Sequence, residues 1–216
     1  MKLQLLIIII LSIPINLISS EFNITRLKYQ GGGDWYSDPS SIPNLLDFIE
    51  TETGIKTADN EIQATIGSSN FFNNPYYYIT GHGNIKFSQK EREILREALL
   101  NGAFLHADDN YGLDNSFRKE MKEIFPDKEW VQLPPNHRIF NILFKFADGL
   151  PKIHEHDGEA SKALALFHDD KIIVLYTYQS DLGDGWENRN VHNHNLDLHK
   201  TALKMGTNIV IHYLTN

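Results

Sequence analysis

The sequence predicts one three-layer α/β domain, with helices on both faces of a mostly parallel sheet and a late antiparallel hairpin. Short apolar runs typical of strands alternate with longer amphipathic helical patterns, which is the arrangement of βαβ units. Near the end of the chain, apolar runs at 163–167 and 171–178 are separated only by Asp169 and Asp170, and this favours a hairpin. No internal repeat or linker interrupts residues 21–216, so they are interpreted as a single domain.

The first half of the chain is expected to supply three strands and two helices. The first helix is predicted to begin at Ser40 or Ser41 and to end at Gly54, a residue that readily adopts a left-handed conformation. Ser88 is predicted to cap the second helix, with Glu91 as its capping-box partner. The strands are expected at 22–29, 61–66 and 75–79, and the second helix continues to residue 100.

In the second half, the pattern predicts a buried strand at 103–107 and a helix at 116–125 that Pro126 ends. A short strand at 130–133 and an irregular region at 134–158 follow. The predicted hairpin comes next, and a closing helix is expected at 196–214.

Residues 1–20 have the pattern of a secretory signal peptide. Lys2 supplies a positive charge, residues 5–11 are an unbroken apolar run, and Ser19–Ser20 are small enough for cleavage. An uncleaved membrane anchor is the alternative, but Pro14 and Asn16 break the apolar stretch and favour cleavage. The mature domain, residues 21–216, is therefore expected to be periplasmic or otherwise exported, with no stable membrane span.

Composition excludes several classes of function. The chain has 216 residues, 41% of them hydrophobic, which suits one domain with a substantial core. Without residues 1–20 it has 19 basic and 28 acidic residues, so nucleic acid is not expected as a partner. The absence of cysteine excludes a disulfide framework, a thiolate metal site and a cysteine nucleophile. Serine-hydrolase, P-loop and Rossmann dinucleotide motifs are also absent.

Polar clusters follow several of the apolar runs, and ligands of open α/β sheets bind beyond the carboxyl ends of strands. Gly81, His82 and Gly83 follow one such run. The glycines would let backbone N–H groups approach a ligand, and His82 could act as a base, a proton donor or a ligand. A tight turn with a hydrogen-bonded imidazole is the alternative.

Asp108, Asp109 and Asn110 follow the strand predicted at 103–107. Adjacent carboxylates on a strand point to opposite sides, so one of the two is expected to face the site. Like charges this close raise the pKa of one carboxyl group, which keeps it available as an acid. The alternative is a polar turn with side-chain-to-backbone hydrogen bonds.

His154, His156 and Asp157 have a spacing that can bind a divalent metal. On an extended backbone the two imidazoles share a face, and a carboxylate follows directly. No third ligand is fixed by spacing, and many such histidine pairs bind no metal.

Residues 181–186 are interpreted as a turn that presents Asp181 and Asp184 beside the aromatic ring of Trp186, because the spacing lacks the alternating oxygens of an EF-hand. Trp186, like Trp35 and Tyr36 in the first loop, could stack on a sugar or could pack on the core. His192 and His194 are weaker candidates in what is expected to be a solvated loop.

Taken in order, these loops resemble the bacterial family called domain of unknown function 4159. The similar segments include Gly31-Gly-Gly-Asp-Trp-Tyr36, Thr80-Gly-His-Gly-Asn84, Phe104-Leu-His-Ala-Asp108, Leu150-Pro-Lys-Ile-His-Glu-His-Asp-Gly158 and Ser180-Asp-Leu-Gly-Asp-Gly-Trp-Glu187. The resemblance implies a flavodoxin-like sheet related to class I glutamine amidotransferases and ThuA-like proteins. It implies no reaction, and the absence of cysteine excludes glutamine hydrolysis by the amidotransferase route.

Two hypotheses follow for the function. The first is an exported enzyme that uses acid–base or metal-assisted chemistry on a sugar-like substrate. The second is a non-catalytic domain that binds a cell-envelope glycan or a protein partner. For the enzyme, the assigned residues are His82, Asp108, Asp109, His154 and Asp181 for catalysis, Gly81, Gly83, Asn110, Trp35, Tyr36, Asp184 and Trp186 for ligand contact, and His154, His156 and Asp157 for a divalent metal.

Overall fold

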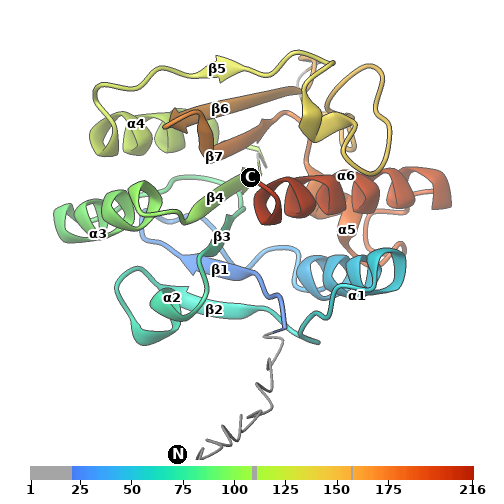
Figure 1. Cartoon of the computed structure of the whole chain (residues 1–216), viewed down its shortest axis with the longest axis horizontal. Helices are drawn as coiled ribbons and strands as arrows, with labels where there is room; N and C mark the ends of the chain where they lie inside the picture. The colour runs from blue at the N-terminus through green and yellow to red at the C-terminus, as the bar shows by residue number, and fades with distance from the viewer. Residues whose placement is uncertain (1–20, 109–110, 157) are drawn as a thin grey trace, which may run out of the picture.

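The computed structural model describes residues 21–108, 111–156 and 158–216, and its centre is a seven-stranded mixed sheet (Figure 1). The strand order is β2-β1-β3-β4-β7-β6-β5. The first five of these strands are parallel, and β5, β6 and β7 pair antiparallel. The strands are β1 (Thr25–Lys28), β2 (Ile62–Thr65), β3 (Tyr76–Ile79), β4 (Phe104–Asp108), β5 (Val131–Gln132), β6 (Lys162–His168) and β7 (Lys171–Tyr178). The predicted α/β class and the late hairpin are confirmed.

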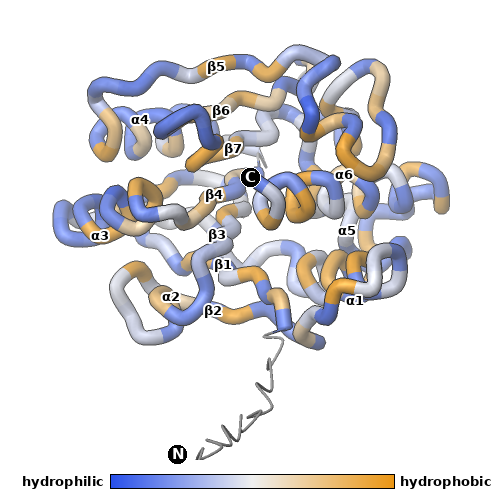
Figure 2. The backbone as a smooth tube through the Cα atoms, viewed as in Figure 1, coloured by the Kyte–Doolittle hydropathy of each residue, from blue (hydrophilic) through white to orange (hydrophobic). Residues whose placement is uncertain are grey.

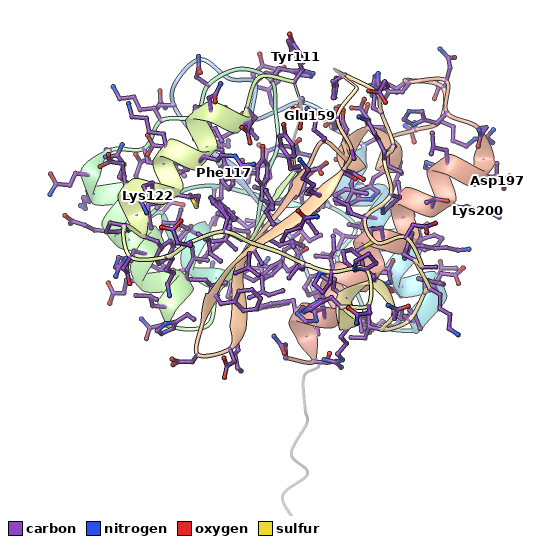
Figure 3. All side chains as sticks on the ribbon, turned by 90° about the horizontal axis from the view of Figure 1, so that it is seen from above. Tyr111, Phe117, Lys122, Glu159, Asp197 and Lys200 are labelled. Carbon is purple, nitrogen blue, oxygen red and sulfur yellow. The ribbon has the colours of Figure 1, made fainter. Side chains whose placement is uncertain are left out.

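Helices cover both faces of the sheet and complete the three layers. One face carries α1 (Ser41–Thr53), α5 (Leu182–Trp186) and α6 (Leu196–Leu214), and the other carries α2 (Ser69–Asn73), α3 (Gln89–Leu100) and α4 (Asp114–Ile124) (Figure 1). A short 3-10 helix, η1 (Arg138–Phe140), packs on α6. Seen from above, Phe117 and Lys122 of α4 lie across the sheet from Asp197 and Lys200 of α6 (Figure 3).

Two hydrophobic cores, one on each face, hold the layers together. All residues of β3 and β4 are buried, as expected for central strands of a parallel sheet covered on both sides. Hydropathy differs between the two faces, because α6 mixes hydrophobic and hydrophilic segments whereas α3 is mostly hydrophilic (Figure 2). Among the helices of the described residues, none combines the length and apolar character needed to cross a bilayer.

The local signals in the sequence explain several element boundaries. Gly54 ends α1 in the left-handed conformation, at φ 73°. Ser88 and Glu91 form both hydrogen bonds of the predicted capping box at the start of α3. Asp169 and Asp170 both have positive φ, which closes the tight turn between β6 and β7.

Several strands are shorter than predicted, for example Thr25–Lys28 within 22–29 and Val131–Gln132 within 130–133, and three differences concern the α-helices. Helix α4 begins at Asp114, two residues before the predicted start, and α2 was not predicted. Residues 181–186, interpreted from sequence as a turn, contain α5. A five-residue helix with two glycines shows no helical periodicity, and α5 forms because Leu182 and Trp186 are buried in the core against α1 and α6.

This topology brings several loops to one edge of the sheet. Because β1, β3, β4 and β7 are parallel, their carboxyl ends meet there. The segments that leave this edge include those that carry Asp38, His82, Tyr111 and Asp181.

Replacement of Gly206 by alanine tests the packing between α1, α5 and α6. An added Cβ would lie 2.7 Å from Leu45 Cδ1 and 2.8 Å from the Trp186 ring. Although alanine favours helix, Gly206→Ala is expected to lower the unfolding free energy by ~1–3 kcal/mol because these neighbours are close-packed. Urea denaturation measures this change. Lys200→Ala, at an exposed position on the same helix, is the control. A Gly206→Ala variant as stable as this control would show that Leu45 and Trp186 can shift without loss of stability.

Candidate functional site

Five acidic side chains are buried beyond the carboxyl ends of β1, β4 and β7. They are Asp38, Asp108, Asp181, Asp184 and Glu187, none more than 6% exposed. A carboxylate inside a protein is costly unless it finds hydrogen-bond donors or cations. The partners of these five residues therefore define the chemistry of this place, which we call the His/Asp site.

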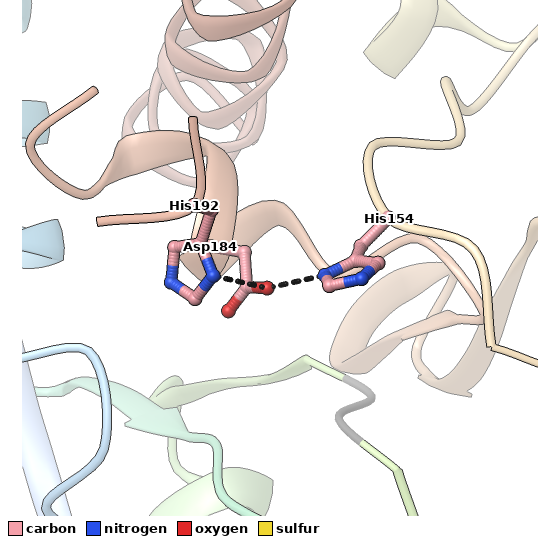
Figure 4. Close-up of side chains that lie close together, drawn as sticks. All are labelled: His154, Asp184 and His192. Carbon is pink, nitrogen blue, oxygen red and sulfur yellow. Dashed lines mark hydrogen bonds and ion pairs between the residues drawn. The ribbon is translucent and has the colours of Figure 1, made fainter. Parts of the chain in front are cut away.

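Three histidines are partners of Asp181, Asp184 and Glu187. His154 Nδ1 lies 2.6 Å and His192 Nδ1 3.2 Å from the same oxygen, Asp184 Oδ2, so that the carboxylate lies between two imidazoles (Figure 4). The other nitrogen of His192 lies 3.2 Å from Glu187 Oε2. His156 Nε2 lies 2.8 Å from Asp181 Oδ2. Among the ion pairs of the described residues, those of Asp181, Asp184 and Glu187 are all with histidine.

The local backbone explains why these rings converge. His154 and His156 are two residues apart, so they project from the same side of their segment, and their rings stack at 4.9 Å. The N–H groups of Ile153 and His154 donate to Ser180 O, which anchors this segment at the end of β7. His192 lies in the turn between α5 and α6, and the ring of His194 stacks on it at 5.6 Å.

Asp108 is fully buried at the end of β4 and receives several donors. Its Oδ1 accepts from Thr177 Oγ1 at 2.5 Å, and its Oδ2 accepts from the Gly183 N–H at 2.6 Å. Burial raises the pKa of Asp108 to about 7, against the effect of these hydrogen bonds. Gly183 has no room for a side chain, since a Cβ would lie 2.9 Å from both Asp38 Oδ2 and Tyr78 Oη.

His106 extends this network into the strand. Its Nε2 lies 3.1 Å from Thr177 Oγ1, which links His106, Thr177 and Asp108. Burial lowers the pKa of His106 to about 3, so the imidazole is neutral near neutral pH.

Asp181 combines burial with an unpaired atom. Its pKa is raised well above the usual range, first by burial and then by the negative charges of Asp184, Asp108 and Asp38. Its Oδ2 lies 2.8 Å from His156 Nε2, but Oδ1 is buried and has no hydrogen-bond partner within the described ranges 21–108, 111–156 and 158–216. Buried acceptors are almost always satisfied, so this oxygen indicates a missing donor or cation.

The residues present fit a divalent cation. His154, Asp184 and His192 each offer one ligand atom, all within 4.8 Å of one another. Ligands at ~2.0–2.2 Å from a tetrahedral ion are ~3.3 Å apart, so the rings beside Asp184 would need only small shifts. Two imidazoles and a carboxylate suit ions such as Zn²⁺ or Mn²⁺.

The structure brings together Asp108, His154, His156, Asp181 and Asp184 of the residues proposed from sequence. The potential metal ligands grouped with His154 are Asp184 and His192. His156, which was predicted as a ligand, instead pairs with Asp181. Asp109, Asn110 and Asp157, also proposed from sequence, lie outside the described residues.

The Gly81–Gly83 loop borders this site. His82 Nδ1 lies 3.2 Å from Asp34 Oδ2, and the His82 N–H also donates to that carboxylate. The Gly83 N–H donates to Tyr111 O, and the Tyr111 ring lies 5.9 Å from that of His156. Tyr111 thus connects the loop to the His/Asp site.

The three aromatic candidates differ in exposure. Tyr36 is 63% exposed and packs edge-on against Trp35, which is partly buried. Trp186 is buried in the core and donates its indole N–H to Ala202 O at 2.8 Å. Trp186 therefore packs on the core, which was one of the two roles considered for it from the sequence. Its ring is not exposed to solvent.

Sequence reasoning gave no role to Asp38 or Glu187 and ranked His192 low. Asp38 lies in a loop 70 residues before Asp108 and more than 140 residues before Asp181, Asp184 and Glu187, and no spacing rule connects them. Glu187 directly follows the Asp181–Trp186 segment, so the run of three acidic residues within seven positions was the available signal.

Comparison with known proteins identifies a family for this chain. Residues 23–214 match the family model described as Domain of unknown function (DUF4159), which spans nearly all of the described chain. No curated protein matches the sequence.

The hydroxyl of Thr177 is expected to stabilise the buried end of β4. Thr177→Val keeps the shape of the side chain but removes the partner of Asp108 and His106, and should cost ~1–3 kcal/mol in unfolding free energy. Thr177→Ser retains the hydroxyl and is the matched control in urea denaturation. If the valine variant is as stable as the serine variant, the network does not support the site.

Proposed function

The chain belongs to the DUF4159 family, and we propose that it is a metal-dependent enzyme that hydrolyses a sugar-like, polyhydroxylated substrate at the His/Asp site. One observation carries this proposal. Imidazoles from two separate segments converge on a single buried carboxylate oxygen, Asp184 Oδ2. Burying this carboxylate beside two imidazoles carries a desolvation penalty, so it contributes little to the stability of the fold. The same groups are suitable ligands for a cation.

His154, Asp184 and His192 are the proposed ligands. A divalent cation held by them would polarise a substrate oxygen and lower the pKa of a water molecule. The His154 side chain is 43% exposed, so this side of the site is open to solvent and to a substrate.

His156 and Asp181 are proposed as the acid–base pair. The carboxylate orients the imidazole, as in other sites where a base is held by a third group. Asp108 is a positioning residue in this proposal, because it holds Gly183 and therefore the start of α5 that presents Asp184.

The surroundings of the site support a substrate with many hydroxyl groups. Tyr111 is 64% exposed beside His156 and offers a face on which a sugar ring can stack. The Gly81–Gly83 loop, with His82 and Asp34, supplies polar groups nearby. Tyr36 and Trp35 in the first loop are proposed as further ligand contacts.

We also infer the wider relationship. The order β2-β1-β3-β4-β7 in parallel is that of flavodoxin-like sheets, which supports kinship with class I glutamine amidotransferases and ThuA-like proteins. The chain contains no cysteine, so it does not hydrolyse glutamine through a cysteine nucleophile.

The proposed setting is outside the cytoplasm. It rests on the signal-peptide pattern of residues 1–20, which lie outside the described residues. The acidic composition of the mature domain supports a small-molecule, glycan or envelope-protein partner over nucleic acid.

A non-catalytic binding domain is the second candidate. The exposed aromatic rings of Tyr36 and Tyr111 favour it, since such rings are common in glycan-binding surfaces. It differs from the enzyme in one measurable respect, because it would bind a glycan without turnover.

Metal content and hydrolysis together test the proposal. Protein purified without chelator is expected to contain a divalent metal and to cleave members of a panel of 4-nitrophenyl glycosides and acetylated sugars. EDTA should abolish the activity, and Zn²⁺ or Mn²⁺ should restore it. His154→Ala and His192→Ala should each lower metal content and reduce activity by ~100-fold or more, because each removes a ligand.

His168→Ala is the control for these variants, because His168 lies at the β6–β7 turn on the opposite edge of the sheet. Its metal content and activity should equal those of the unmodified protein. Glycan binding without turnover, in a protein that takes up no metal, would instead establish the binding domain.

A further inference from the structure

A second group of potential metal ligands shares Asp184 with the first. Asp38, Asp181 and Asp184 are all buried, and each offers an oxygen within 4.8 Å of the other two. The three come from the loop after β1 and from the segment at the start of α5. Asp184 therefore belongs to two groups, one completed by two imidazoles and the other by two carboxylates.

The unpaired oxygen of Asp181 indicates that this second group needs a ligand. Asp181 is 1% exposed, and its Oδ2 is occupied by His156. Among the residues that the structure describes, no atom is a hydrogen-bond partner of its Oδ1. A buried acceptor left unsatisfied destabilises the folded state, and more so if it is charged, so a cation at this oxygen would remove that penalty.

Two divalent cations are also compatible with the charge of the site. The five buried acidic residues of the site carry up to five negative charges when ionised. One divalent cation among neutral imidazoles would leave three of these charges uncompensated, and two cations would leave one. Arg26 does not fill this role, because its guanidinium pairs with Glu61 at 2.8 Å and donates to the carbonyl oxygens of Ser37 and Asp38.

We propose that the His/Asp site is dinuclear and binds two divalent cations that the Asp184 carboxylate bridges. His154 and His192 hold the first cation, and Asp38 and Asp181 hold the second. Paired cations ~3.5–4 Å apart are a recurrent arrangement in hydrolytic sites, where they clamp the attacking and leaving oxygens. This inference rests on the proposed function, which requires only the first cation.

The stoichiometry of Mn²⁺ binding tests the second position separately from the first. Mn²⁺ accepts both carboxylate and imidazole ligands. Titration calorimetry of the metal-free protein with Mn²⁺ should give two ions per chain. Asp181→Asn keeps the shape of the side chain and should bind one. Electron paramagnetic resonance should show a spin-coupled pair in the unmodified protein and an isolated ion in the variant.

Asp197→Asn, an exposed position on α6, is the matched control and should still bind two ions (Figure 3). If Asp181→Asn fails to fold by circular dichroism, Asp38→Asn replaces it with the same expectation. One ion per chain in the unmodified protein would overturn the dinuclear site but leave the proposed function intact. No binding at all would overturn both, and two ions in both Asp→Asn site variants would refute the assigned ligands.

Discussion

The hydrogen bond from the Gly183 N–H to Asp108 is the contact on which the site depends. It joins the end of the central strand β4 to the first turn of α5, and so sets where Asp181 and Asp184 face. Thr177 donates to the other oxygen of Asp108, and a side chain at Gly183 would crowd Asp38 and Tyr78. The buried Asp108 carboxyl group therefore positions Asp181 and Asp184. Their carboxyl groups in turn contact the histidines of the site.

That dependence explains why the fold was easier to predict than the site. Strong local signals predicted several boundaries, including Gly54 at the end of α1, the capping box at Ser88 and the two aspartates at the hairpin turn. Helix α5 lacked such a signal, because five residues with two glycines look like a turn until Leu182 and Trp186 are buried against α1 and α6. Tertiary packing overrode local preference there.

The candidate site was predictable only in part. Residues at strand ends or with a two-residue spacing, such as Asp108, His154 and His156, could be nominated because strand geometry fixes their direction. Their partners could not. Asp38 reaches the site from a loop far away in sequence, and His192 is oriented by Asp184 and Glu187, which are themselves placed by α5. Spacing rules act along one segment, whereas this site is assembled from several.

The proposed chemistry requires that Asp184, His154 and His192 hold a metal ion. Anomalous X-ray diffraction from crystals grown with Mn²⁺ or Zn²⁺ locates such an ion. An anomalous peak is expected ~2.0–2.3 Å from an Asp184 oxygen and from a ring nitrogen of each histidine. No peak at saturating metal, with both rings still hydrogen-bonded to the carboxylate, would contradict it and leave the histidines as structural partners of buried acids.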